Sequence, residues 1–179
     1  MAVKVRERKW TYRYLMFSLL TLLFTISMSV TAFGGQFEDA VAAYGRDDYA
    51  TAYRLFKLLA EQGDAKSQFN LALMYDDGQG VPKSDAEAVK WYRRAAEQGD
   101  ASSQLNLGVM YYKGQGVPQD YVLSHMWLNL AASKFPASEG EKREIAVENI
   151  NIVASEMTLA QVTEAQRLAQ EWKPKKEVR

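Results

Sequence analysis

The stretch EQGDAKSQFNLALMYDDGQGVP occupies residues 61–82, and EQGDASSQLNLGVMYYKGQGVP occupies residues 97–118. Sixteen of the 22 aligned positions are identical, and the two stretches are offset by 36 residues. Self-similarity at a fixed period of this size is typical of proteins built from repeated supersecondary units. The chain is therefore predicted to have a repeat architecture.

Each repeat has the pattern of two helices joined by a glycine turn. In the second unit, residues 84–98 begin with a capping-box pattern (SDAE) and carry one apolar stripe at helical spacing. Gly99 is expected to end this helix, Asp100 to cap the next one, and Gly114 to stop that one in a left-handed conformation. Each unit is thus predicted to be a helical hairpin.

Shifting the pattern by 36 residues in either direction finds the first helix type three times and its partner twice. Such units cannot bury their apolar faces alone, so we expect them to stack into an all-α solenoid over residues 36–172 with capping helices at both ends. The expected parts are repeats at about 50–85 and 86–121, a partial repeat at 122–135, and C-terminal capping helices at 138–172. Residues 173–179 are expected to form a flexible tail.

The two ends of the array differ from the repeats. A short helix over 37–44 is expected to supply the missing partner before the first unit, with Asp47 or Asp48 capping the helix that follows. Towards the C-terminus, an S-x-x-E pattern from Ser138 and a T-x-x-Q pattern from Thr158 predict the starts of two more helices.

Small residues at equivalent positions of the two copies indicate close packing between helices. Gly108 and Ala72 occupy the same place in the two copies. A small residue there lets neighbouring helices approach closely, and a larger side chain would overpack the contact. We therefore expect Gly108 to lie where two helices touch.

The first 32 residues have the pattern of an export signal. A basic stretch, KVRERKW, precedes the apolar run LMFSLLTLLFTISMSV and a small-residue site that ends at Ala32. Cleavage after Ala32 would give a periplasmic or secreted protein. The alternative is an uncleaved inner-membrane anchor, because residues 14–33 are near the minimum length for a spanning helix.

Composition excludes several kinds of site. Outside the first 32 residues, acidic residues outnumber basic ones by four, which argues against a nucleic-acid partner. The absence of cysteine excludes disulfides and thiolate metal sites. The one histidine, His125, falls in a helical pattern and is expected to be packed or solvated rather than catalytic. The glycine loops lack the phosphate-loop pattern, so no catalytic, cofactor or metal site is predicted.

The elements A-E-A, W-Y-R, A-A-E-Q-G-D-A, Q-x-N-L-G and G-x-G-V-P occur in order within residues 86–118 and more loosely in 50–82. With these motifs the chain resembles the Sel-one-like repeat, a relative of the tetratricopeptide repeat. The resemblance covers roughly residues 45–135. It implies a right-handed solenoid of tetratricopeptide-like hairpins that serves as a protein-binding scaffold, often in the periplasm or outside the cell. A penicillin-binding or β-lactamase-like activity described for some members is not carried over, because no S-x-x-K motif lies among the repeats.

The leading hypothesis is an exported, non-enzymatic adaptor of the bacterial cell envelope that binds a protein or peptide. The candidate binding residues are basic and fall on the polar sides of successive helices of the first type, where they could form a stripe: Arg54, Lys57, Lys90, Arg93 and Arg94. The alternative for these five residues is an ordinary solvated face. The oligomeric state and the identity of the partner are not indicated by the sequence.

Two other functions remain open. One is an envelope hydrolase that acts on cell-wall material, suggested by the export pattern and by adjacent carboxylates such as those at 47–48 and 76–77. Adjacent acids at helix ends are more simply caps and solubilising charge than an acid and a base held some distance apart. The other is a regulatory subunit tethered to a membrane complex by an uncleaved leader.

Overall fold

The computed structural model describes residues 35–175, which are helical throughout apart from turns and connections. After a helical segment at 35–44, the helices follow in the order α2 (Tyr49–Glu61), α3 (Ala65–Asp77), α4 (Asp85–Gln98), α5 (Ala101–Lys113), α6 (Tyr121–Lys134), a short 3₁₀ helix η1 (Ala137–Glu139), α7 (Gly140–Ser155) and α8 (Leu159–Glu171). The expected export signal at 1–32 lies outside the described residues. Within residues 35–175 no helix is both long and apolar enough to cross a membrane.

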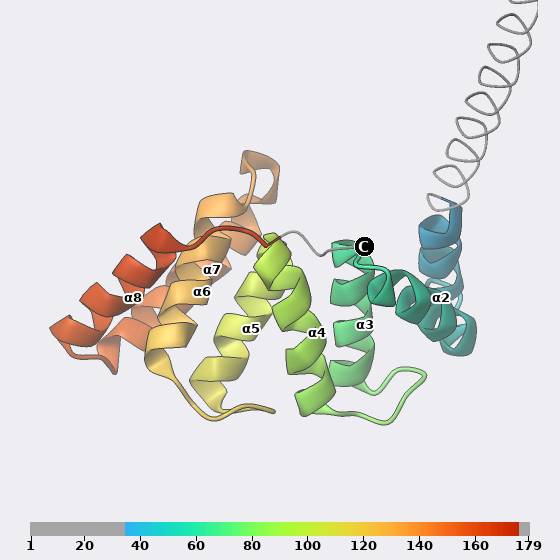
Figure 1. Cartoon of the computed structure of the whole chain (residues 1–179), viewed down its shortest axis with the longest axis horizontal. Coiled ribbons are helices and arrows are strands. Elements are labelled where there is room, and N and C mark those ends of the chain that lie inside the picture. The colour runs from blue at the N-terminus through green and yellow to red at the C-terminus, as the bar shows by residue number, and fades with distance from the viewer. Residues whose placement is uncertain (1–34, 176–179) are drawn as a thin grey trace, which may run out of the picture.

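Consecutive helices pack side by side in one row from α2 to α6, and α7 and α8 cover the far end (Figure 1). The most extensive contacts join α3 to α4 and α5 to α6. The contacts between α2 and α3 and between α4 and α5 are smaller but continuous with them. The predicted all-α solenoid is therefore confirmed, and α3 lies between α2 and α4.

Equivalent caps begin and end the repeated helices. Asp64 and Asp100 each accept a hydrogen bond of 2.7 Å from the backbone N–H three residues on, at the starts of α3 and α5. Gly78 and Gly114 end these helices in the left-handed conformation, with φ of 74° and 66°. Glycine adopts this conformation without the steric cost of a Cβ atom. The predicted roles of Asp100 and Gly114 are confirmed.

A buried glutamine in each repeat joins one helix to the end of the preceding one. The side-chain amide of Gln68 donates to the Ala60 carbonyl at 3.1 Å, and that of Gln104 donates to the Ala96 carbonyl at 3.0 Å. Both glutamines are fully buried. Each of these carbonyls also accepts from a backbone N–H of the turn that follows, from Gly63 at Ala60 and from Gly99 at Ala96. The glutamine amides therefore add a second hydrogen bond at the buried ends of the two helices.

Three helix caps were predicted at the ends of the array, and the structure confirms two of them. Asp48 caps α2 by accepting from the Thr51 N–H at 3.2 Å, and Thr158 forms a complete capping box at α8. The prediction for Ser138 is wrong, since Ser138 lies within η1 and α7 begins at Gly140 with no side-chain cap. Ser138 does not cap α7 because it already lies inside η1, which begins after Pro136 and continues directly into α7.

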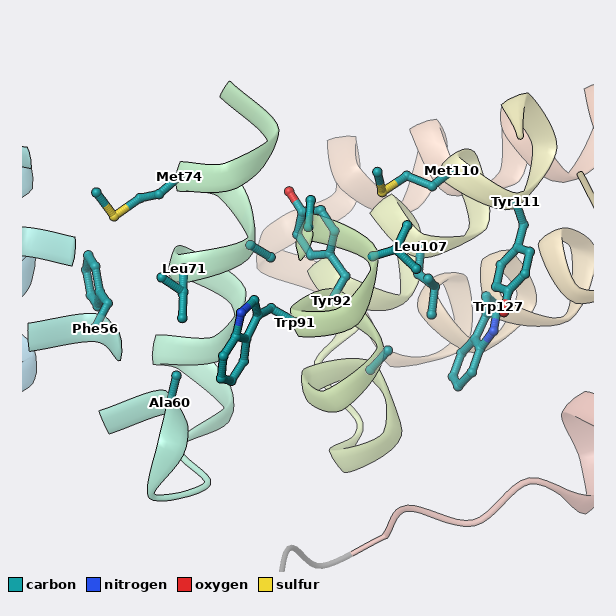
Figure 2. Packing of buried hydrophobic residues seen from close by; sticks show 14 of the residues in the cluster. Phe56, Ala60, Leu71, Met74, Trp91, Tyr92, Leu107, Met110, Tyr111 and Trp127 are labelled. Atoms are coloured by element: carbon teal, nitrogen blue, oxygen red, sulfur yellow. The ribbon is translucent and has the colours of Figure 1, made fainter. Parts of the chain in front are cut away.

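The larger of two hydrophobic clusters among the described residues runs along the row of helices. Figure 2 shows its large members lying between successive helices, from Phe56 and Leu71 through Trp91 and Tyr92 to Leu107 and the neighbouring aromatic residues. These side chains are buried, with Tyr92, Leu71 and Leu107 fully so. Burial of apolar surface is the main favourable term in folding. Each helix therefore depends on its neighbours for stability.

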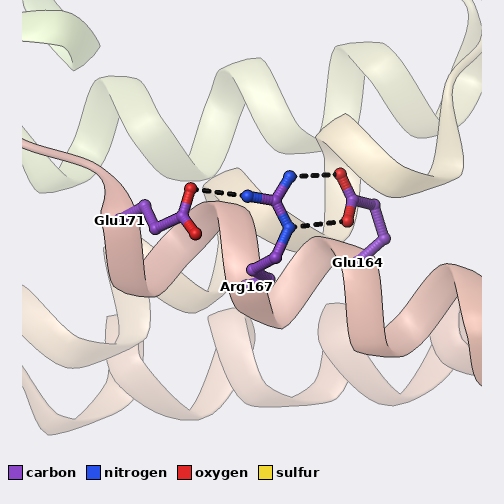
Figure 3. A network of polar contacts seen from close by, with 3 residues as sticks. All are labelled: Glu164, Arg167 and Glu171. Carbon is purple, nitrogen blue, oxygen red and sulfur yellow. Dashed lines mark hydrogen bonds and ion pairs between the residues drawn. The ribbon is translucent and has the colours of Figure 1, made fainter.

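The C-terminal helix α8 packs on α6, and its outer face carries an ion-pair network. Arg167 bonds both oxygens of Glu164 at 2.7 and 2.8 Å and reaches Glu171 at 2.5 Å (Figure 3). These three groups are largely exposed, so salt screens the network. After Glu171 the chain leaves the helix and returns across the row towards α4 (Figure 1).

Candidate protein-binding surface

A cation lies beside a tyrosine in each of two successive repeats, although the tyrosine in contact is not at the equivalent position. On α4, a guanidinium nitrogen of Arg93 donates to the hydroxyl of Tyr111 on α5 at 2.8 Å. One repeat earlier, the Lys57 ammonium of α2 lies 5.6 Å from the ring centroid of Tyr53, and the Tyr53 hydroxyl is 3.0 Å from that of Tyr75 on α3. Lys57 and Arg93 are 36 residues apart, as are Tyr75 and Tyr111. We name these five residues the tyrosine–cation surface.

The Tyr75 hydroxyl on this surface is a neutral hydrogen-bonding group. Burial, and then the hydrogen bond with Tyr53, raises the pKa of the Tyr75 hydroxyl above its ordinary value. Tyr75 therefore keeps its proton at physiological pH. A neutral hydroxyl beside a lysine or an arginine can donate to a carboxylate while the cation supplies the opposite charge.

Two further cations cover a buried indole on α4. The Arg94 guanidinium lies 4.7 Å and the Lys90 ammonium 5.7 Å from the Trp91 ring centroid. Trp91 itself is only 5% exposed, and Lys90 also pairs with Glu87 at 3.2 Å. The charged ends of both side chains thus lie close to the indole ring, at distances where cation–π attraction acts.

The structure divides the five candidate binding residues into two groups. Arg54 and Lys57 lie on α2, and the other three, Lys90, Arg93 and Arg94, lie on α4 with α3 between the two helices. Arg54, Lys57 and Lys90 are exposed, whereas Arg93 and Arg94 are half-buried. The equivalent positions on α6 hold methionine, asparagine and leucine, so the basic pattern does not extend to that helix. A role for the five residues in binding stays a prediction.

The aromatic partners of these cations were not among the predicted binding residues. The 36-residue spacing of Tyr75 and Tyr111 is visible in the sequence, but it also fits a packing role. Tyr53 has no such signal, because Val89 takes the equivalent position. The pairing of Tyr53 with Tyr75 depends on how α2 lies against α3, which the sequence pattern alone does not specify.

The carboxylates that suggested a hydrolase lie at helix ends. Asp48 caps α2, and Asp47 accepts from the Tyr49 hydroxyl at 2.7 Å. Asp76 and Asp77 occupy the last turn of α3. Burial raises the pKa of the Asp76 carboxyl, and the nearby Lys83 ammonium opposes that rise. A perturbed carboxyl can mark a functional site, but structural packing also produces such shifts.

His125 is packed in α6, which is one of the two environments expected for it, packed or solvated. Its side chain is 2% exposed, and its Nδ1 accepts from the Asn129 amide at 2.8 Å. Burial lowers the pKa of this imidazole, which favours the neutral form. Among residues 35–175, no group of three or more histidine, aspartate or glutamate side chains is arranged to hold a metal ion.

Comparisons with known proteins agree with this architecture. A family model described as Sel1 repeat matches residues 42–64, 65–100 and 101–134, just over half of the chain. Its units pair α3 with α4 and α5 with α6, one helix out of phase with the units expected from the sequence. No curated protein matches the chain.

Two solved structures are similar to this chain. One is a protective antigen present in uropathogenic Escherichia coli strains that displays an SLR fold; it is 30% identical with a TM-score of 0.70, over 78% of this chain and 29% of that one. The other is a Sel1 repeat protein from Oxalobacter formigenes, 32% identical with a TM-score of 0.55, over 63% of this chain and 87% of that one. The chain thus matches less than a third of the length of the first.

Proposed function

The chain belongs to the Sel1 repeat family, and on that basis we propose that it is a non-enzymatic scaffold that binds a protein partner in the bacterial cell envelope. The family suggests a protein–protein interaction scaffold. Within this proposal, the partner binds on the tyrosine–cation surface through a segment that carries carboxylates.

The observation that carries this proposal is that cations and tyrosines 36 residues apart, Lys57 with Arg93 and Tyr75 with Tyr111, lie on two successive repeats, although the tyrosine in contact with the cation differs between them. Arg93 with Tyr111, and Lys57 with Tyr53 and Tyr75, place hydroxyls and positive charge together on two successive repeats. Tyrosine and arginine are the side chains most enriched at interfaces and their energetic centres. A partner with carboxylates at the matching spacing would engage both repeats at once.

Charge reversal tests the surface. We expect the double variant Lys57→Glu, Arg93→Glu to lose partner binding by about tenfold or more, because repulsion replaces attraction at both pairs. Co-purification from the native envelope, quantified by mass spectrometry, would identify the partner, and titration of the purified partner would measure the loss. Thermal melts would verify that the variant folds.

The matched control is Lys142→Glu with Arg143→Glu on α7. Both residues are exposed, so this variant has the same change in net charge at a different place. Binding should be close to that of the parent protein. If both double variants lost affinity equally, the effect would come from net charge alone and the proposed surface would be wrong.

The hydrolase alternative is tested by incubating the purified protein with peptidoglycan, glycosides and a β-lactam. The scaffold proposal expects no turnover, and measurable turnover of any of the three would contradict it. Export is a separate part of the proposal. Mass spectrometry of the mature N-terminus distinguishes a start at Phe33, expected for a periplasmic or secreted protein, from an intact Met1, expected for a tethered regulatory subunit.

A further inference from the structure

The residues after α8 lie against the row of helices. Trp172 leaves the helix in an extended conformation, with φ −64° and ψ 137°. Its ring meets that of Trp127 on α6 edge to face, with centroids 6.3 Å apart. The Lys134 ammonium, at the end of α6, lies 4.4 Å from the Trp172 centroid. Trp172 is therefore anchored by an aromatic contact and a cation–π contact.

Three residues later, the chain makes two bonds to α4. The backbone N–H of Lys175 donates to the Glu97 carbonyl at 2.8 Å, and the Lys175 ammonium lies 3.2 Å from the Glu97 carboxylate. The last turn of α4 holds no basic residue of its own. Lys175 thus supplies a donor and a positive charge where the carbonyls and the dipole of α4 favour them.

The turn between α4 and α5 leaves room for this contact. A Cβ atom at Gly99 would lie 2.6 Å from the Lys134 ammonium and 3.7 Å from the Trp172 ring. Gly99 also has a φ of 100°, which other residues rarely adopt. The missing side chain therefore gives Lys134 space beside the indole.

The segment is suited by its sequence to an extended conformation. Pro174 fixes its own φ, and it disfavours the helical conformation of Lys173 before it. Residues 172–175 can thus span about 10 Å between α6 and α4. The ion pair of Arg167 with Glu171 holds the last turn of α8, from which Trp172 departs.

We propose that Glu97, Gly99, Trp127 and Lys134 form a second binding site, which we name the tail site, for an extended peptide segment that carries an aromatic residue and a lysine three positions later. The chain's own residues 172–175 occupy it, and a partner protein's segment of the same chemistry displaces them. The proposal extends the proposed scaffold function to another surface. Because none of the tail-site residues belongs to the tyrosine–cation surface, the two can fail separately.

Occupancy by the chain's own segment sets the affinity that a partner must exceed. A tethered segment acts at a high effective concentration, commonly in the millimolar range for short connections. A free peptide of the same sequence should therefore bind the parent protein weakly. It should bind more tightly once the internal contact is weakened.

The test uses a fluorescently labelled synthetic peptide of residues 171–179, EWKPKKEVR, titrated into full-length proteins and followed by anisotropy. The Lys175→Glu protein should bind it about fivefold more tightly than the parent, because its own segment meets Glu97 with a like charge. Adding Glu97→Lys to that protein should remove the gain. A peptide with alanine in place of Trp172 should bind the Lys175→Glu protein several-fold more weakly.

A second readout follows the internal contact without any peptide. The Glu97→Lys protein should be cleaved by trypsin after Lys175 several-fold faster than the parent, whereas Glu148→Lys, an exposed change on α7, should have no effect. The proposal is overturned if Lys175→Glu gives no gain in peptide binding, or if cleavage is equal in all proteins. It is also overturned if size-exclusion chromatography shows a concentration-dependent dimer that Lys175→Glu abolishes, since the occupant would then be a second copy.

Discussion

Replacing Gly108 with leucine is expected to lower the free energy of unfolding by about 1 to 3 kcal/mol, because it overpacks the contact between α5 and α6. A Cβ atom at this position would lie 2.7 Å from Cγ of Leu128 and 3.2 Å from the Ser124 carbonyl oxygen. The Ser124 hydroxyl also donates to the Gly108 carbonyl at 2.7 Å, which fixes the two helices close together. In a domain of this size, each kcal/mol corresponds to about 2 to 4 °C in Tm.

The same substitution at Gly140 is the control. Gly140 is the first residue of α7, and nothing lies within 4 Å of the position of its Cβ atom. Gly140→Leu should therefore leave Tm nearly unchanged or raise it slightly through helix propensity. If Gly108→Leu were as stable as the parent in the same melts, the close contact of α5 with α6 would be wrong.

Truncating Tyr92 to alanine should cost about 3 to 5 kcal/mol, the range for removing a large aromatic side chain from a core. Tyr92 is fully buried on α4, and the centroid of its ring lies 6.0 Å from the ring centroid of Phe69 on α3. The cavity would open between the two helices that make one of the most extensive contacts in the array. Urea unfolding followed by circular dichroism would measure the loss.

Tyr92→Phe separates the ring from the hydroxyl. The hydroxyl oxygen is buried beside Asp76 and Asn106 but makes no hydrogen bond of good geometry, and burial raises its pKa. Because an unpaired buried hydroxyl contributes little to stability or costs free energy, Tyr92→Phe should change the free energy of unfolding by less than about 1 kcal/mol. A loss as large as that of Tyr92→Ala would show that the hydroxyl, not the ring, stabilises the contact.

The fold could be predicted from the sequence because its signals are local and repeated. The Asp100 cap and the Gly114 stop each depend on a few neighbouring residues, and both were confirmed. The position of Gly108 at a helix contact followed from its small size at a repeated position, and the contact with Leu128 confirms it. The helical pattern around His125 left open whether its side chain is packed or solvated, and the structure shows it packed.

The candidate surfaces depend on contacts between residues far apart in the chain, which local patterns do not specify. The bond of Arg93 with Tyr111 joins two helices, and the basic residues of α2 and α4 are separated by α3. Residues 173–179 were expected to be flexible, which stays a prediction, but Lys175 within them contacts Glu97. That contact depends on where α8 places the end of the chain, and no repeat pattern reports it.

A protein partner is proposed to bind on the tyrosine–cation surface. Hydroxyl-radical footprinting of the protein, alone and with its co-purified partner, would test whether the partner covers this surface. We expect oxidation of Tyr53 and Tyr75 to fall several-fold in the complex. Oxidation of Ile145 and Val147, which are 42% and 43% exposed on α7, should not change. Unchanged oxidation of both tyrosines, with protection of the two α7 residues instead, would contradict the proposal.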